Sequence, residues 1–143
     1  MKIAILGDTH FGVRGDSIAF HNHYRKFYSE TFFPYLVQNG ITTIFQLGDL
    51  FDRRKYISFQ SLALCRRYFF DQLVKNDIQC HVLLGNHDIF FKNTLEVNSP
   101  DLLLREYENH VILYDKPSMW NGIDVIPSWQ ILPRSISKPA SSK

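Results

Sequence analysis

The sequence predicts an α/β fold in which helices flank a mainly parallel sheet. Short apolar segments, typical of buried strands, alternate along the chain with longer segments whose apolar residues recur at helical spacing. Strand, helix, strand, helix, strand is the order of right-handed βαβ units, and such units build parallel sheets. The strands are expected at residues 2–6, 43–47, 79–84, 111–114 and 123–126.

The first helix is predicted from a capping residue and from its apolar spacing. Ser17 is placed to accept a backbone hydrogen bond as the N-cap, and Asn39-Gly40 is a typical helix end. Pro34 lies inside the pattern and should break or kink the helix. The stripe expected to face the core consists of Phe20, Tyr24, Phe27, Thr31 and Tyr35.

The rest of the chain is expected to form two more helices and a tail. Ser58 is the predicted N-cap of a helix that runs to about residue 75, and a short helix is expected over residues 100–107 after a polar loop. Residues 128–143 combine proline, serine and basic residues without a period, which is typical of a mobile tail. We therefore expect one domain over residues 1–127, followed by that tail.

Composition excludes several classes of protein. The 143 residues are 45% hydrophobic, which argues against disorder, and the net charge of +2 is too small to indicate nucleic-acid binding by itself. Cys65 and Cys80 lie in apolar segments without metal or redox spacing, so free buried thiols are expected. The apolar N-terminal segment is too short for a signal peptide or a membrane span, which predicts a cytoplasmic protein without a membrane partner. For a viral protein this would be the host cytoplasm.

Three polar motifs carry the candidate chemistry, and each directly follows a predicted strand. They are Asp8-Thr9-His10, Gly48-Asp49-Leu50-Phe51-Asp52 and Gly85-Asn86-His87-Asp88. In open parallel sheets, ligands bind beyond the carboxyl ends of the strands. Carboxylate, imidazole and amide oxygen together suit a divalent transition metal such as Mn²⁺, Fe²⁺ or Zn²⁺. Asp49 follows the strand expected between the other two and could bridge two metals roughly 3.5–4 Å apart.

Each motif by itself has a plainer explanation. Asp8 could cap a turn beside an idle histidine, Asp52 could cap a helix, and residues such as Asn86 are common in turns. Asp49 after a buried strand would still need a partner, because a buried charge is costly unless it is paired or binds metal. Three motifs in order at strand ends favour a metal-dependent phosphoesterase site.

The motifs resemble those of the calcineurin-like metallophosphoesterase superfamily. The longer runs Gly-Asp-Leu-Phe-Asp-Arg-Arg-Lys at 48–55 and Leu-Gly-Asn-His-Asp at 84–88 are similar to its DNA-repair branch, the SbcD-type nucleases, including the phage form. The resemblance covers roughly residues 1–127 and implies the N-terminal half of a four-layer α/β/β/α fold. It implies a metal-dependent DNA exonuclease or endonuclease subunit that hydrolyses phosphodiester bonds in recombination and repair.

The resemblance also implies a ligand set. Asp8, His10 and Asp49 would bind one divalent ion, and Asp49 and Asn86 would bind a second. Mn²⁺ is the expected metal, and Mg²⁺, Fe²⁺ or Zn²⁺ are the alternatives.

The remaining motif residues receive roles in catalysis and substrate binding. His87 would protonate the leaving oxygen, for which its pKa range is suited. Asp52 matches the carboxylate that orients this histidine in protein phosphatases, although many SbcD-type enzymes carry a histidine there. Arg53 and Arg54 either hold a substrate phosphate or form a solvated basic loop that balances the acidic site, and both interpretations stay open.

One departure from the family bears on activity. Its members complete both metal sites with later histidines, one isolated and two in a Gly-His-x-His motif. After His87 this sequence has only His110, which lacks that motif, while His21 and His23 lie on a predicted helix. The expectation is an incomplete metal site in a truncated form of the enzyme, with poor hydrolysis by this chain alone.

The resemblance implies partners as well. DNA would be the substrate, an SMC-like ABC ATPase of SbcC type would be the partner subunit, and the full-length family forms homodimers. Two alternatives stay open. One is a protein or small-molecule phosphatase or phosphodiesterase of the same superfamily, since phosphatases also carry Gly-Asp-x-x-Asp-Arg. The other is a non-catalytic remnant that only folds or dimerises.

Overall fold

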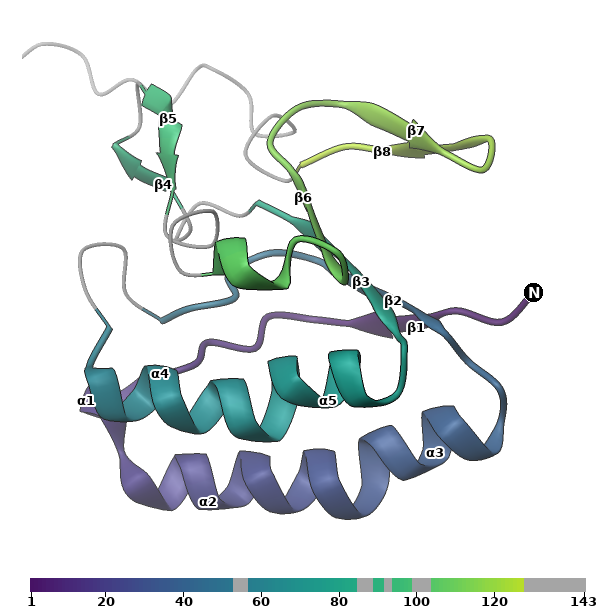
Figure 1. Cartoon of the computed structure of the whole chain (residues 1–143). Coiled ribbons are helices and arrows are strands. Elements are labelled where there is room, and N and C mark those ends of the chain that lie inside the picture. Colours follow the sequence, from purple (N-terminus) through teal and green to yellow (C-terminus); the bar gives the residue numbers. More distant parts are fainter. Residues whose placement is uncertain (53–56, 85–88, 92–93, 99–103, 128–143) are drawn as a thin grey trace, which may run out of the picture.

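The structure is a computed structural model that describes residues 1–52, 57–84, 89–91, 94–98 and 104–127. Its strands are β1 (Ala4–Leu6), β2 (Thr43–Gln46), β3 (Gln79–Leu83), β4 (Ile89–Phe91), β5 (Thr94–Asn98), β6 (Val111–Tyr114), β7 (Ser118–Trp120) and β8 (Ile123–Val125) (Figure 1). Its α-helices are α1 (Val13–Asp16), α2 (Ile18–Phe27), α3 (Phe33–Gln38), α4 (Phe59–Cys65) and α5 (Asp71–Lys75). Two π-helical turns, η1 (Tyr28–Phe32) and η2 (Arg66–Phe70), and the 3₁₀ turn η3 (Arg105–Tyr107) complete the set.

A four-stranded parallel sheet is the centre of the fold, in the order β1-β2-β3-β6. Ile5 pairs with Phe45, and Ile44 pairs with Cys80 across the next ladder. All four strands run in the same direction, so their carboxyl ends meet at one edge. The predicted mainly parallel α/β fold is confirmed, and so is the central place of β2 between β1 and β3.

Helices cover one face of this sheet (Figure 1). The core between the helices and the sheet is rich in aromatic rings. Tyr28 and Tyr68 stack with their ring planes 4° apart, and Phe69 meets Tyr28 edge-to-face at 5.0 Å between centroids. Each such pair of rings stabilises the fold by roughly 0.5–1.5 kcal/mol, in addition to the gain from burying apolar surface.

The hairpin β7–β8 lies on the other face of the sheet (Figure 1). There Phe45 stacks on His81 at 4.7 Å, and Trp120 of the hairpin meets both rings. A strand was predicted at 123–126, but β8 pairs antiparallel with β7 and does not join the parallel sheet. A second hairpin, β4–β5, occupies the region where a polar loop was predicted.

The place of β1 at the edge of the sheet does not follow from its sequence. Its apolar sequence is typical of a central strand, yet in the described sheet β1 is one of the two outer strands, together with β6, and Ile5 is 63% exposed. Sequence hydrophobicity does not report which strand ends a sheet, because that depends on which segments pair.

The first predicted helix does not end at Pro34 but continues through it to Gln38. Immediately before Pro34, the N–H of Phe33 donates to the carbonyl of Tyr28, five residues earlier, so that the π-helical turn η1 precedes the proline. Such a register shift accommodates a residue that lacks an N–H.

The core-facing side of this helix was predicted wrongly. Phe20, Phe27 and Tyr35 are exposed, and Tyr24 is half-buried. The residues that are buried lie one or two positions further along the chain: His21, Tyr28, Phe33 and Leu36. The reason is that His21 finds hydrogen-bond partners in the core, Ser61 at 2.6 Å and Tyr68 at 3.0 Å.

The predicted helix caps and the cysteines agree with the structure in most respects. Ser58 is the N-cap of α4, and its Oγ accepts a hydrogen bond from the Ser61 N–H at 3.0 Å. Ser17 stands at the N-cap of α2 without a side-chain capping bond. Cys65 and Cys80 are free, buried thiols, as predicted. Of the helix expected over residues 100–107, only the part from residue 104 is described, and it holds the 3₁₀ turn η3. The predicted tail lies outside the described residues.

Candidate metal centre

The first two motifs form adjoining turns at the carboxyl edge of the sheet. The N–H of His10 donates to the carbonyl of Asp49 at 3.0 Å, and the N–H of Phe11 donates to the carbonyl of Leu50 at 2.9 Å. The N–H of Asp52 then donates back to the carbonyl of Phe11 at 3.0 Å. These bonds extend the β1–β2 pairing beyond the strands, so the two turns are held side by side.

Apolar residues between the polar ones anchor both turns in the core. Phe11, Leu50 and Phe51 are almost fully buried, and Phe11 forms a parallel bridge with Phe51. The buried hydroxyl of Thr9 donates to the carbonyl of Leu50 at 3.0 Å and adds a further bond between the turns. As a result, the polar side chains project from a rigid base.

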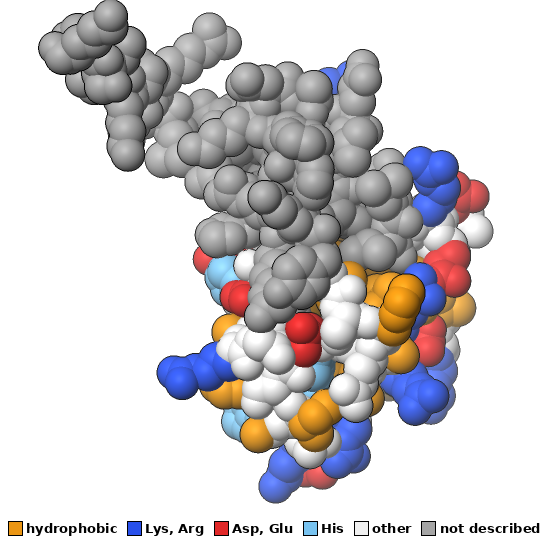
Figure 2. All heavy atoms as spheres, turned by 90° about the vertical axis from the view of Figure 1, so that its left-hand side faces the viewer, with side chains coloured by type: hydrophobic (Ala, Val, Ile, Leu, Met, Phe, Trp, Pro, Cys, Tyr) orange, Lys and Arg blue, Asp and Glu red, His pale blue; other side chains and the backbone are white. Residues whose placement is uncertain are grey.

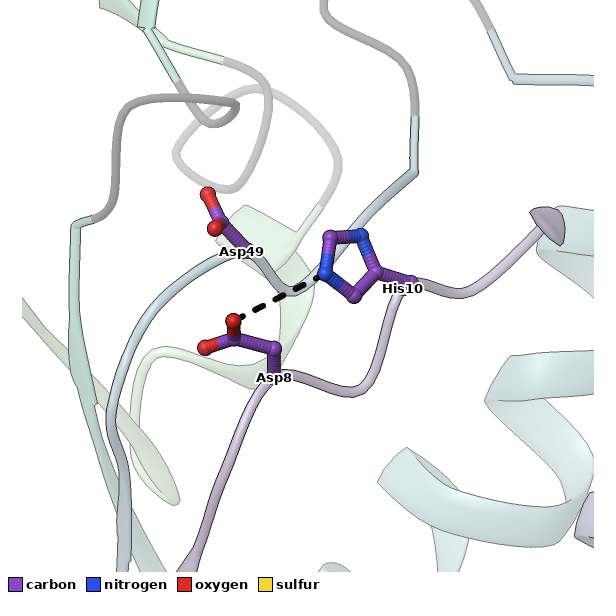
Figure 3. Close-up of side chains that lie close together, drawn as sticks. All are labelled: Asp8, His10 and Asp49. Atoms are coloured by element: carbon purple, nitrogen blue, oxygen red, sulfur yellow. Dashed lines mark ion pairs between the residues drawn. The ribbon is translucent and has the colours of Figure 1, made fainter.

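The turns bring Asp8, His10 and Asp49 together (Figure 3). Each offers one ligand atom, and these atoms all lie within 4.8 Å of one another. Nε2 of His10 is 3.7 Å from Oδ2 of Asp8. Figure 2, which faces this edge of the molecule, shows a histidine ring beside acidic side chains at the surface. The three residues predicted to bind one metal therefore meet, although they lie up to 41 positions apart in the sequence.

The backbone at this site adopts conformations that most residues avoid. His10 has φ 46° and Asp49 has φ 50°, both in the left-handed region, and Gly48 between the strand and Asp49 has φ 110°. Each such non-glycine residue costs of order 1–3 kcal/mol. The surrounding hydrogen bonds and the buried Phe11 and Phe51 hold these conformations in place.

Asp52 lies on the other side of the His10 ring, with Oδ1 3.6 Å from Nδ1. A metal-binding histidine usually directs its second ring nitrogen toward a carboxylate or a carbonyl, which fixes its orientation. Asp52 is therefore placed to orient His10. Its predicted partner, His87, lies outside the described residues, and the role of Asp52 toward it stays a prediction.

Four of the predicted site residues lie outside the described residues. They are Arg53, Arg54, Asn86 and His87. The third motif does follow β3, which is parallel to β2 and next to it. His21 is buried in the helical layer, and His110 lies before β6, 3.3 Å from Asp77. Neither belongs to the cluster.

Sequence reasoning missed Gln46, which is fully buried at the end of β2. Its amide bonds both ligand-bearing turns, with Gly7 and Gly48 as partners. A polar residue inside the apolar run of residues 43–47 was the signal that could have identified it.

The comparison with known proteins shows the family to which the chain belongs. The sequence profile described as calcineurin-like phosphoesterase matches residues 1–136. This chain belongs to the calcineurin-like phosphoesterase family. The chain is also similar to exonuclease subunit 1 of Enterobacteria phage T4, with 37% identity over 131 residues. The alignment covers 89% of this chain and 38% of that protein, so the chain spans well under half of the relative's length.

The residues present fit the metal chemistry of this family, whose members bind divalent metals. Two carboxylates and an imidazole with ligand atoms within 4.8 Å suit a divalent transition ion. Concentrated negative charge at the strand ends, from Asp8, Asp49 and Asp52, further favours a cation there. Among the described helices of this phosphoesterase chain, none has the length and apolar character needed to cross a membrane.

Proposed function

We propose that this protein acts as a subunit of a metal-dependent DNA nuclease of SbcD type, hydrolysing phosphodiester bonds. The observation that carries the proposal is the meeting of Asp8, His10 and Asp49 at the carboxyl edge of a parallel sheet. Family membership gives the reaction class, and the similarity to a protein named exonuclease subunit 1 favours DNA as the substrate.

The side chains would divide the work as follows. Asp8, His10 and Asp49 hold one divalent cation, and Asp49 with Asn86 holds a second, with Mn²⁺ as the expected metal. Such cations supply Lewis-acid chemistry, because they polarise a phosphoryl oxygen and generate a nucleophile from water at neutral pH. Asp49 would be shared by the two cations, and the position of β2 between β1 and β3 supports this role.

The proton and the substrate are handled by other residues. His87 would donate a proton to the leaving oxygen. Asp52 would orient a histidine, either His87 as the sequence predicts or His10, which it lies beside. Arg53 and Arg54 directly follow Asp52 and would contact backbone phosphates of the DNA, as guanidinium groups do well. The partner subunit would be an SMC-like ABC ATPase, and the nuclease subunit would form a homodimer.

The variant Asp49→Asn tests the proposal, through its affinity for Mn²⁺ and its hydrolysis of DNA. Asparagine tolerates the left-handed backbone better than most residues, so this variant removes the charge with little added strain. Asp124→Asn is the matched control, because Asp124 is exposed on β8 and lies outside the cluster. We expect Mn²⁺ affinity, measured by electron paramagnetic resonance, to fall by more than about tenfold in Asp49→Asn and to stay unchanged in the control.

The choice of substrate separates the alternatives. Mn²⁺-dependent cleavage of a linear DNA duplex that is lost in Asp49→Asn supports the nuclease. Preferential hydrolysis of a phosphomonoester would instead indicate a phosphatase. Mn²⁺ binding with little turnover is the result that the predicted incomplete metal site leads to, so the substrate comparison is made on a chain that also carries the later histidines of the family. Absence of Mn²⁺ binding in the wild type would refute the metal site.

A further inference from the structure

Gln46 occupies an unusual position at the end of β2. It is 0% exposed, and its neighbours in the sheet are Leu6 of β1 and Val82 of β3. A buried amide must find hydrogen-bond partners, because an unsatisfied one destabilises the fold. Its side-chain hydrogen bonds to the described residues go to the two turns that carry the proposed metal ligands.

The carboxamide joins both turns at once. Its Nε2 donates to the carbonyl of Gly7 at 3.2 Å and to the carbonyl of Gly48 at 2.6 Å. Its Oε1 accepts from the N–H of Gly48 at 2.9 Å. The orientation of the amide is unambiguous, since the reverse would place its oxygen against two carbonyl oxygens.

These bonds bridge a gap in the backbone pairing. The β1–β2 ladder ends where the N–H of Leu47 donates to the carbonyl of Leu6, and pairing resumes where the N–H of His10 donates to the carbonyl of Asp49. Between those points the Gln46 side chain joins the two segments of the polypeptide. Gly7 directly precedes Asp8, and Gly48 directly precedes Asp49, so this side chain bonds the residues next to two of the proposed ligands.

We infer that Gln46 is a positioning residue that sets the separation of Asp8 and Asp49 and thereby the affinity of the site for its cation. The inference rests on the proposed metal site. Gln46 does not touch the metal or the substrate. It holds Gly48 at φ 110° and so fixes the direction in which Asp49, at φ 50°, presents its carboxylate.

Gln46→Met tests this role because methionine has a similar length and fills the same space without hydrogen bonds. We expect the dissociation constant for Mn²⁺, measured by electron paramagnetic resonance on the 143-residue chain, to rise by about 10–100-fold. Amide hydrogen exchange at Gly48 should accelerate in the same variant. Gln46→Asn is the second variant, since its amide is one methylene too short to reach both turns, and the same result is expected.

Val82→Ala is the matched control. Val82 pairs with Gln46 in the sheet register and is fully buried, so its truncation lowers the unfolding temperature without removing a hydrogen bond between the turns. Gln79→Met is a second control, because Gln79 is an exposed glutamine at the opposite end of β3. Both controls should bind Mn²⁺ as the wild type does.

The outcomes separate this inference from the proposed function. Wild-type binding that is retained within about twofold in Gln46→Met would overturn the positioning role and leave the metal site standing. The role is also overturned if Val82→Ala weakens Mn²⁺ binding as much, or if both Gln46 variants are unfolded, since either result assigns Gln46 to stability alone. A wild type that binds no Mn²⁺ would remove the metal site, and the positioning role with it.

Discussion

Replacement of Phe11 by leucine probes how the core supports the metal centre. Phe11 follows His10 in the first turn and is 1% exposed. Its ring lies among six others at centroid distances of 5.6–6.3 Å, from Tyr24, Tyr28, Phe51, Tyr68, Phe69 and Phe70. These rings come from the helices and from the second turn, so Phe11 joins the site to the helical layer.

The expected loss of stability follows from this burial. Leucine has three fewer side-chain carbons than phenylalanine, which at about 0.8 kcal/mol per buried carbon corresponds to about 2.4 kcal/mol. Loss of the edge-to-face contacts raises the total to about 3 kcal/mol, because such contacts add roughly 0.5–1.5 kcal/mol beyond area. Neighbouring rings cannot easily close the space, since each is held by its own contacts. A loss of this size is a large part of the roughly 5–15 kcal/mol that stabilises a typical domain.

Urea unfolding followed by circular dichroism measures this change. Phe59→Leu is the matched control, because Phe59 begins α4 and is 92% exposed, and its replacement should change the free energy of unfolding by less than about 0.5 kcal/mol. A Phe11→Leu variant that loses less than about 1 kcal/mol, or no more than the control, would refute the account of Phe11 as the anchor of the turn.

Two further predictions concern capping and pH. Ser58→Ala should lower the free energy of unfolding by about 1 kcal/mol, because it removes the hydrogen bond from the Ser61 N–H. Ser17→Ala removes no side-chain capping bond and should lower it by less. Equal losses for the two variants in urea unfolding would contradict this prediction. Burial lowers the pKa of His21 and of His81 below 6.5, so the unfolded chain takes up protons at a higher pH than the folded one. Their contribution to stability is therefore complete above about pH 6.5 and declines as the pH falls below it, and the urea midpoint should drop between pH 7.5 and 5.5. The drop should be smaller in His81→Leu, and a midpoint that does not change with pH would contradict the prediction.

Local sequence patterns predicted the strands of the parallel sheet and the first two motif turns well. Apolar runs ended by glycine and aspartate locate β1, β2 and β3, and strict βαβ order leads to a parallel sheet. Because parallel strands place their carboxyl ends at one edge, the meeting of Asp8, His10 and Asp49 follows from the order of motifs. These features depend on a few neighbouring residues and on a general rule of topology.

Features that depend on partners distant in sequence were missed or wrong. The buried side of α2 contains His21 because Ser61 and Tyr68, on another helix, satisfy its ring nitrogens. Periodicity alone favoured the aromatic stripe one position away. The outer place of β1 and the pairing of β8 with β7 are likewise decided by which segments meet.

The sequence by itself determined the class of fold and the family, and it predicted which residues would bind metal, because these follow from short motifs and their order. The tertiary structure alone decided how the ligands are held. Gln46 contributes nothing to a recognisable motif, yet it joins both turns where the backbone ladder is interrupted. Asp52 comes to lie beside His10 because the two turns bond backbone to backbone. The physical reason is that a metal site needs ligand atoms at defined separations. Those separations are set by hydrogen bonds between segments that are distant in sequence, such as the bond from the Gln46 amide to the Gly7 carbonyl, 39 positions away.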